Sequence, residues 1–218
     1  MENRNRLIVF IAITLITATF FYLQSPPFKK QAVQNTSEKL SQQDMVALNE
    51  YIPDLKIDLR YATAKNFTGT KIYEKNIAYL RRGTAEKLKA AQAEFSSMGY
   101  TIKVWDAYRP PAAQFSLWNS YPDSRFVINP HKGFSYHSRG VAVDVTLVKG
   151  NKEIPMPTGF DDFTARANRD YSDVSKEVAD NARLLEQIMV KHGFNSIFYE
   201  WWHFIDQDKD QYPVYYLE

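Results

Sequence analysis

One short segment near the end of the chain, residues 198–204, constrains the fold more than any other. It carries a glutamate and a histidine inside a run that includes five aromatic residues. Burying such polar side chains is costly unless partners satisfy them. The fold must therefore bring partners to Glu200 and His203. The alternative is an aromatic core strand in which His203 is simply hydrogen-bonded.

The spacing of Glu200 and His203 adds a second constraint, on the backbone. In a regular strand, residues that are three apart point to opposite faces of the sheet. If both side chains serve one site, the backbone must turn or bulge between them. We therefore predict an irregularity at Trp201 or Trp202.

A second polar cluster, residues 135–146, offers the partners that the aromatic run requires. Gly140 permits a turn, and the residues after it alternate as a strand that carries Asp144 on one face. His137 lies in the loop before this strand, from where it could fold back toward the same face. Taken alone, the cluster is better explained by a surface histidine and an aspartate that caps a loop, and only the aromatic run changes this balance.

Together, His137, Asp144 and His203 make up the donor set of a catalytic zinc site. Two imidazoles and one carboxylate are three protein ligands, so tetrahedral zinc keeps a fourth position for water. Zinc lowers the pKa of bound water from about 15.7 to about 7, and the spare carboxylate of Glu200 can accept its proton. We predict one Zn²⁺ per chain in a hydrolytic site, although other divalent ions also accept such donors.

The composition narrows the chemistry further. The chain has no cysteine, which excludes disulfides, thiolate metal ligands and cysteine nucleophiles. The formal net charge is only +2, and basic residues alternate with acidic ones, so nothing indicates a nucleic-acid surface. The expected partner is a small substrate.

Arg109 ends a predicted strand, a position at which site residues are common. Its guanidinium could stabilise the oxyanion of a tetrahedral intermediate, a role in which one donor typically contributes about 3 kcal/mol or more. A salt bridge between Asp106 and Arg109 explains the same segment equally well.

The first residues predict that the chain has three parts. Arg4 and Arg6 precede an uncharged apolar run, residues 7–23, which is an export segment or an anchor. As a helix, the run would rise about 25 Å against a hydrocarbon core of about 30 Å, which narrowly favours a cleaved signal peptide. Basic residues before the run place the remainder in the periplasm or on the outer side of the cytoplasmic membrane. We expect a signal peptide or membrane anchor over 1–25, a polar tether over 26–43 and one domain over 44–218.

Apolar periodicity predicts helices and strands in mixed order within the domain. One helix should be capped by Thr84 and end at Gly99, and another should cover about 175–191, with Gly193 past its end. Strands are expected over 56–61, 100–108 and 141–147. The lack of regular β-α-β spacing predicts a single α+β domain, with helices flanking a largely antiparallel central sheet that carries the zinc site.

Five segments, in this order, resemble the D-alanyl-D-alanine dipeptidases. These form the VanX-like branch of the zinc peptidases, which also include D,D- and L,D-carboxypeptidases of cell-wall peptides. The segments that carry the resemblance are residues 58–63 with 66–69, 105–110, 135–144, 160–161 and 200–203.

The resemblance implies a role for each matching position. The implied zinc ligands are His137, Asp144 and His203, the general base is Glu200, Arg109 stabilises the transition state, and Tyr61, Ser135 and Asp161 line the substrate pocket. In the family, a carboxylate at the position of Asp161 helps to hold the substrate's ammonium. The chain departs from the family at Met156-Pro157, where Met-Gly is usual, so Asp162 stays open as the alternative ammonium anchor. The export segment is a second departure, because members that act in the cytoplasm lack one.

The expected activity is hydrolysis of D-Ala-D-Ala, or of a related small cell-wall dipeptide, outside the cytoplasm. The nearest alternative is a carboxypeptidase that trims longer peptidoglycan peptides and needs a pocket open on the amino-terminal side of the scissile bond. A non-catalytic zinc-containing binding module is a third possibility. Glu200 argues against it, because a module of that kind has no use for a base.

Overall fold

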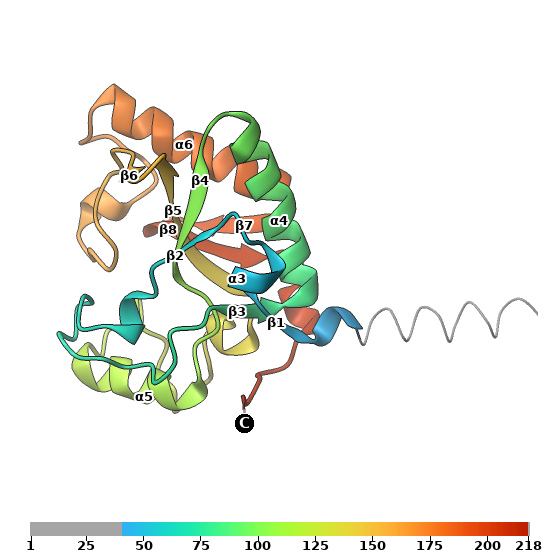
Figure 1. Ribbon diagram of the computed structural model, residues 1–218. Coiled ribbons are helices and arrows are strands. Elements are labelled where there is room, and N and C mark those ends of the chain that lie inside the picture. Colours follow the sequence, from blue (N-terminus) through green and yellow to red (C-terminus); the bar gives the residue numbers. More distant parts are fainter. Residues whose placement is uncertain (1–40, 218) are drawn as a thin grey trace, which may run out of the picture. The chain divides into compact units, whose positions relative to one another are not determined.

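The computed structural model describes residues 41–217, and their main feature is a central six-stranded sheet (Figure 1). The order of the strands is β2-β4-β5-β8-β7, and β6 pairs with β5. Only β2 and β4 run parallel, whereas all other pairs in this sheet are antiparallel. The predicted α+β class with a largely antiparallel sheet is therefore confirmed. The strands are β2 (Lys56–Ile57), β4 (Thr101–Asp106), β5 (Ala142–Lys149), β6 (Lys152–Glu153), β7 (Phe194–Ile197) and β8 (Glu200–Asp206).

Helices flank this sheet, and a small antiparallel pair of strands, β1 (Met45–Ala47) and β3 (Tyr79–Arg81), lies beside it. Helices α4 and α6 pack against each other, whereas α5 lies apart from both (Figure 1). Besides the helical residues 41–43, the α-helices in residues 41–217 are α3 (Leu48–Tyr51), α4 (Arg82–Ser97), α5 (Pro111–Ser120) and α6 (Lys176–Lys191). None of the helices described is long and apolar enough to cross a membrane.

Most of the amino-terminal segment lies outside the described residues 41–217. The predicted signal peptide or anchor, residues 1–25, lies outside the described residues, as does the predicted tether up to residue 40. Residues 41–43 are helical, and the carbonyl of Gln43 accepts a hydrogen bond from Arg81 Nη1 at 2.5 Å.

Helix α6 matches its sequence signals, whereas α4 begins earlier than predicted. Ser175 caps α6 by accepting a hydrogen bond from the Val178 amide at 3.4 Å. The prediction that Thr84 caps α4 is wrong, because the helix begins at Arg82 and Thr84 lies inside it. The Thr84 hydroxyl instead donates to Asp206 Oδ2 at 2.6 Å, so a buried carboxylate uses the group that would have served as a cap.

Two further expectations need correction. The strand predicted over 56–61 has only two residues, and Tyr61 belongs to a 3₁₀ helix, η1 (Arg60–Ala62). The Tyr61 carbonyl accepts two amides from the following loop, those of Ile72 and Tyr73, each at 2.8 Å, rather than a strand partner. The strand predicted over 100–108 ends already at Asp106, and Pro111 opens α5 soon after it. Proline suits the first turn of a helix, where its missing N–H is not needed.

The sheet is irregular where the aromatic run enters it. Ser196 of β7 pairs with Phe204 of β8, but the next residue, Ile197, pairs with Glu200. Residues 201–203 of β8 therefore have no partner on β7, while on the other side His203 pairs with Asp144 of β5. The predicted irregularity between Glu200 and His203 is confirmed, and it covers three residues.

Candidate active site

Three neighbouring strands bring acidic and imidazole side chains into one row. Asp144 of β5 lies opposite Asp106 of β4 on one side and opposite His203 of β8 on the other. Directly opposed residues of antiparallel strands share a face of the sheet. His137 reaches the same point from the 3₁₀ helix η2 (Tyr136–Arg139), which ends at Gly140 in a left-handed conformation with φ 73°. The chain then turns into β5, so the predicted fold-back of His137 occurs.

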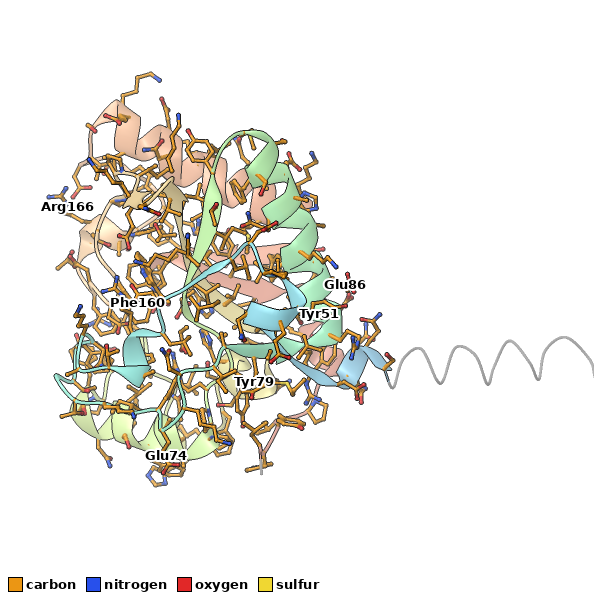
Figure 2. The ribbon with its side chains drawn as sticks, viewed as in Figure 1. Tyr51, Glu74, Tyr79, Glu86, Phe160 and Arg166 are labelled. Carbon is orange, nitrogen blue, oxygen red and sulfur yellow. The ribbon has the colours of Figure 1, made fainter. Side chains whose placement is uncertain are left out.

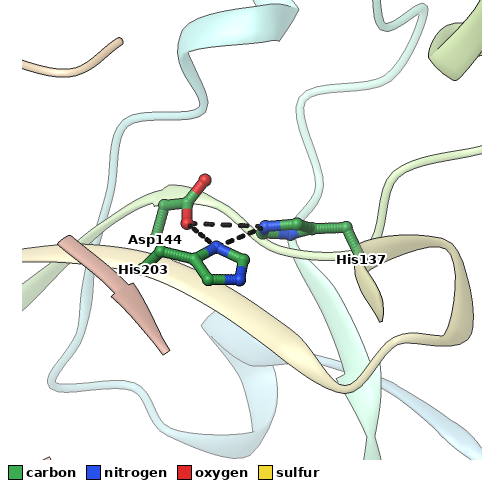
Figure 3. A group of neighbouring side chains, drawn as sticks. All are labelled: His137, Asp144 and His203. Carbon is green, nitrogen blue, oxygen red and sulfur yellow. Dashed lines mark hydrogen bonds and ion pairs between the residues drawn. The ribbon is translucent and has the colours of Figure 1, made fainter. Parts of the chain in front are cut away.

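The donor atoms of His137, Asp144 and His203 lie close enough to share one ion (Figure 3). His203 Nδ1 is 2.8 Å from Asp144 Oδ1 and 3.2 Å from His137 Nε2, and His137 Nε2 is 3.4 Å from Asp144 Oδ1. Donors bound to one tetrahedral zinc ion at about 2.0–2.2 Å are about 3.3 Å apart. All three residues are buried. The geometry thus fits a metal ion with three protein ligands.

The surroundings prepare two of these donors to bind a cation. His137 Nδ1 lies 2.7 Å from the Ala107 carbonyl. Because a carbonyl can only accept, Nδ1 carries the proton and the Nε2 lone pair is left for a metal. Burial raises the pKa of Asp144, but His137 and His203 outweigh this effect and hold the pKa below its usual value. The Asp144 carboxylate is therefore ionised.

Glu200 lies beside the three donors but is not one of them. Its Oε2 is 3.9 Å from His203 Nδ1. Burial raises the pKa of Glu200 to about 8, and the neighbouring His203 side chain acts against that rise. A carboxyl group with a pKa near neutrality can both take up and release a proton at physiological pH. Glu200 is therefore placed and tuned as a free acid–base group.

Arg109 forms the salt bridge with Asp106 that its sequence allowed. Its Nη2 and Nε donate to Asp106 Oδ2 at 2.8 and 3.2 Å, and its Nη1 donates to Gln114 Oε1 at 3.2 Å. Burial acts to lower the pKa of Arg109, but Asp106 raises it well above the usual value, so the guanidinium stays charged. The same side chain lines the cavity next to the three donors. The salt bridge thus fixes a cation at the site.

A cavity of about 340 Å³ opens beside the donors and contains every residue that the sequence analysis placed in the site. The structure brings eight of them together around it: Tyr61, Arg109, Ser135, His137, Asp144, Asp161, Glu200 and His203. Ser135 also caps η2, since its Oγ accepts a hydrogen bond from the His137 amide at 3.3 Å.

Asp161 is a carboxylate in this cavity that has no ion-pair partner among residues 41–217. The Tyr61 hydroxyl contacts its two oxygens at 3.0 and 3.2 Å. Burial raises the pKa of Asp161 well above its usual value, and the charge of Asp144 raises it further. Asp162 does not line the cavity, and its Oδ1 accepts a hydrogen bond from the Thr164 amide at 3.1 Å. The geometry therefore favours Asp161 over Asp162 as the pocket carboxylate.

Aromatic side chains that were not predicted from the sequence line part of the cavity. Phe126 and Phe163 both line it, and their rings stack with centroids 4.7 Å apart. Tyr121 packs on Phe163 at 5.0 Å and Phe67 contacts Phe163 at 5.4 Å. These residues come from loops and helix ends without apolar periodicity, so no pattern in the sequence marked them as one cluster.

Comparison with known proteins adds evidence that is independent of this geometry. Residues 41–218 match the Peptidase M15 family model, whose description is D-ala-D-ala dipeptidase. The chain is 36% identical over 172 residues to the D-alanyl-D-alanine dipeptidase of Escherichia coli strain K12, which covers 78% of this chain and 89% of that protein. It is 32% identical over 192 residues to the D-alanyl-D-alanine dipeptidase of Enterococcus faecium, which covers 78% of this chain and 95% of that protein.

Two solved structures show weaker likeness. One is the LD-carboxypeptidase LdcB, with a TM-score of 0.43 and 19% identity, covering 76% of this chain and 69% of that chain. The other is the vancomycin-resistance D,D-pentapeptidase VanY in complex with Zn(II), with a TM-score of 0.40 and 14% identity, covering 61% of this chain and 75% of that chain. The assignment rests on the sequence matches, and by these the chain belongs to the Peptidase M15 family, that of the D-Ala-D-Ala dipeptidases.

Proposed function

We propose that this protein is a zinc-dependent dipeptidase that hydrolyses D-Ala-D-Ala or a closely related small cell-wall dipeptide. The observation that carries the proposal is the placement of Asp161, a carboxylate without an ion-pair partner among the described residues. It lies in the same cavity as the three metal donors, Glu200 and Arg109. The family match and the two relatives named as D-alanyl-D-alanine dipeptidases support the same conclusion.

Each residue of the site has a distinct part in this reaction. His137, Asp144 and His203 would hold the zinc ion, as the distances between their donor atoms allow. When bound, zinc supplies Lewis-acid activation of water and of the scissile carbonyl. Glu200 would accept a proton from the attacking water and pass it to the leaving amine. Arg109, fixed by its salt bridge, would donate hydrogen bonds to the developing oxyanion.

Asp161 defines which end of a peptide the pocket receives. A buried ammonium needs a paired charge, and Asp161 with the Tyr61 hydroxyl offers one. A dipeptide carries its free ammonium one residue from the scissile bond, whereas a longer peptide has an uncharged amide there. The volume of 340 Å³ is near the lower end of the range for ligand pockets, about 300–1,000 Å³, which suits a small substrate.

A carboxypeptidase for longer peptides is the alternative that the substrate test must exclude. We expect the purified protein to hydrolyse free D-Ala-D-Ala far faster than it releases D-Ala from a stem pentapeptide. Faster turnover of the pentapeptide would contradict the dipeptidase assignment, because the Asp161 carboxylate should favour a free ammonium over the uncharged amide of a longer peptide.

Replacement of Glu200 tests the mechanism. We expect Glu200→Ala to retain one zinc ion per chain, because the three donors are unchanged, and to lose activity by about 10²–10⁴-fold. Metal content and initial rates with D-Ala-D-Ala give the two measurements, and Glu177→Ala, in the first turn of α6, is the control. A fully active Glu200→Ala protein would mean that another group takes the proton, and the mechanism would be wrong.

We further propose that the domain acts outside the cytoplasm. Arg4, Arg6 and the apolar run over 7–23 support this proposal, although they lie outside the described residues. Release of small peptides during cell-wall turnover would then supply the substrate. Fractionation of cells that produce the full chain should recover it outside the cytoplasm, and deletion of residues 1–25 should retain it inside. Recovery of the full chain in the cytoplasmic fraction would contradict the proposal.

A further inference from the structure

The bulge in β8 removes the usual hydrogen-bond partners from part of this strand, which carries Glu200 and His203. Residues 201–203 have no partner on β7, whereas Glu200, just before them, still pairs with Ile197. His203, the last residue of this stretch, is buried. A buried backbone carbonyl without a partner costs free energy comparable to a lost hydrogen bond. Some other group must therefore satisfy the strand here.

A single side chain, that of Arg169, provides these hydrogen bonds. Its Nη2 donates to the carbonyls of Glu200 and His203, at 3.3 and 3.1 Å. Its Nε donates to the carbonyl of Ile197 at 2.7 Å, and its backbone amide donates to the carbonyl of Phe198 at 2.9 Å. Arg169 thus contacts the hairpin of β7 and β8 on both sides of the bulge.

The guanidinium of Arg169 is itself held in place from several directions. It lies over the Phe204 ring at 4.8 Å, and its Nη1 is 3.6 Å from Glu186 Oε1 and 3.5 Å from the Tyr171 hydroxyl. Its side chain is only 6% exposed. A rigid planar fork with five N–H donors can span several carbonyls at once, which the single ammonium of lysine cannot do in the same geometry.

We propose that Arg169 is a positioning residue for the catalytic centre. Its guanidinium replaces the missing strand partner and holds the bulge in the form that turns Glu200 and His203 toward the same ion. Without the bulge, the spacing of three would place these two side chains on opposite faces of the sheet. The inference rests on the proposed metal-dependent function, and it assigns to Arg169 the placement of both the base and the third metal donor.

The experiment compares Arg169→Lys with two controls. Arg166→Lys makes the same change at an exposed arginine of the same loop, whose side chain lies at the outer surface (Figure 2). Leu88→Ala truncates a fully buried side chain of α4 that takes no part in these hydrogen bonds, and so lowers stability without removing any of them. Three properties are measured: zinc affinity by competition with a chelator, the visible absorption spectrum of the Co²⁺-substituted protein, and hydrogen exchange of residues 197–204 in metal-free protein.

We expect Arg169→Lys to bind zinc about 10- to 100-fold more weakly, as is typical when a group that orients a metal ligand is lost. Its Co²⁺ spectrum should change, and residues 197–204 should exchange faster even without metal. Leu88→Ala should lower the melting temperature but leave zinc affinity and the Co²⁺ spectrum unchanged. Arg169→Ala should lose dipeptidase activity. Added guanidine should restore part of that activity, because the free cation can occupy the space that the side chain leaves.

Different results would overturn different parts of this account. If Arg169→Lys matches Leu88→Ala in zinc affinity, Co²⁺ spectrum and exchange, Arg169 only supports the fold and the inference is wrong. If Arg169→Lys does not fold, Arg169→Gln and the guanidine rescue provide the same comparison. If the wild-type protein binds no divalent metal, the proposed function fails. Exchange of residues 197–204 in the metal-free variants would still decide whether Arg169 holds the bulge.

Discussion

Replacing Asp161 with asparagine isolates the charge that we assign to substrate recognition. Asp161 has a left-handed backbone with φ 57°. Asparagine adopts this region more readily than most other residues, so the loop should keep its path. The side-chain oxygen of asparagine can still accept the hydrogen bond of the Tyr61 hydroxyl, which contacts Asp161 at 3.0 Å. The change therefore removes the negative charge and little else.

The size of the effect follows from the environment of Asp161. Removing one partner of a buried ion pair costs about 3–5 kcal/mol, and the low end applies here because Asp161 is only half-buried. A cost of about 3 kcal/mol corresponds to roughly 100-fold in an equilibrium constant. We expect kcat/KM for D-Ala-D-Ala to fall by about this factor, mostly through KM, because the ammonium contact exists before the transition state as well as in it. Hydrolysis of N-acetyl-D-Ala-D-Ala, which lacks the ammonium, should not change.

The pH dependence gives a second readout of the same group. Burial raises the pKa of Asp161, so in the free protein the carboxyl is protonated at higher pH than an exposed aspartate. The ammonium of the substrate binds the ionised form. Affinity should therefore be highest above the raised pKa, and KM should rise as the pH falls through it. Asp161→Asn has no carboxyl to titrate and should lose this rise in KM.

The neighbouring aspartate provides the control. Asp162 bonds the Thr164 amide and does not line the cavity, so Asp162→Asn should leave kcat/KM for D-Ala-D-Ala near the wild-type value. Steady-state kinetics with the free and the N-acetylated dipeptide measure both variants. The reasoning is refuted if Asp161→Asn keeps the wild-type kcat/KM, or if Asp162→Asn shows the larger loss.

Three further substitutions test other parts of the structure. Arg109→Lys should lower kcat about 100-fold with little change in KM, because a hydrogen-bond donor to the oxyanion contributes about 3 kcal/mol in the transition state. An unchanged kcat would contradict that role. Gly140→Ala should lower the free energy of unfolding by at least about 1–2 kcal/mol, because the backbone is left-handed there with φ 73° and the new Cβ would lie 2.8 Å from Met45 Sδ. Denaturant titration measures this loss. Thr84→Val should lower the free energy of unfolding by about 1–3 kcal/mol, because it removes the hydrogen bond of 2.6 Å that the Thr84 hydroxyl donates to buried Asp206. A melting temperature equal to that of the wild-type protein would refute this.

Local patterns were enough to predict the elements that carry the site. The helix over residues 176–191 has both a capping serine and a glycine past its end, and it forms as predicted. The bulge in β8 followed from one requirement, that Glu200 and His203 face one ion, and the structure contains it. In both cases the signal lies within a few residues, so the sequence alone carries it.

Contacts between distant segments could not be predicted in the same way. Thr84 was expected to cap a helix, but its hydroxyl bonds Asp206, which is 122 residues away. Arg169 had no motif around it, and its role depends on carbonyls 28 to 34 residues further along the chain. The preference for Asp161 over Asp162 required knowing which of them lines the cavity, and a contact with Tyr61 across 100 residues. Such assignments need the fold, because the partner that decides them is set by topology.

The metal donors and the substrate groups have different structural supports. Asp144 and His203 lie opposite each other on paired strands, where the hydrogen bonds of the sheet fix their separation. Asp161 and the aromatic pair Phe126 and Phe163 lie on loops, which tolerate changes in sequence and length better than strands do. A substitution in these loops can therefore alter which peptides enter without moving the donors. On the proposed function, the sheet would set the hydrolytic chemistry, and the loop that carries Asp161 would set the length of the accepted peptide.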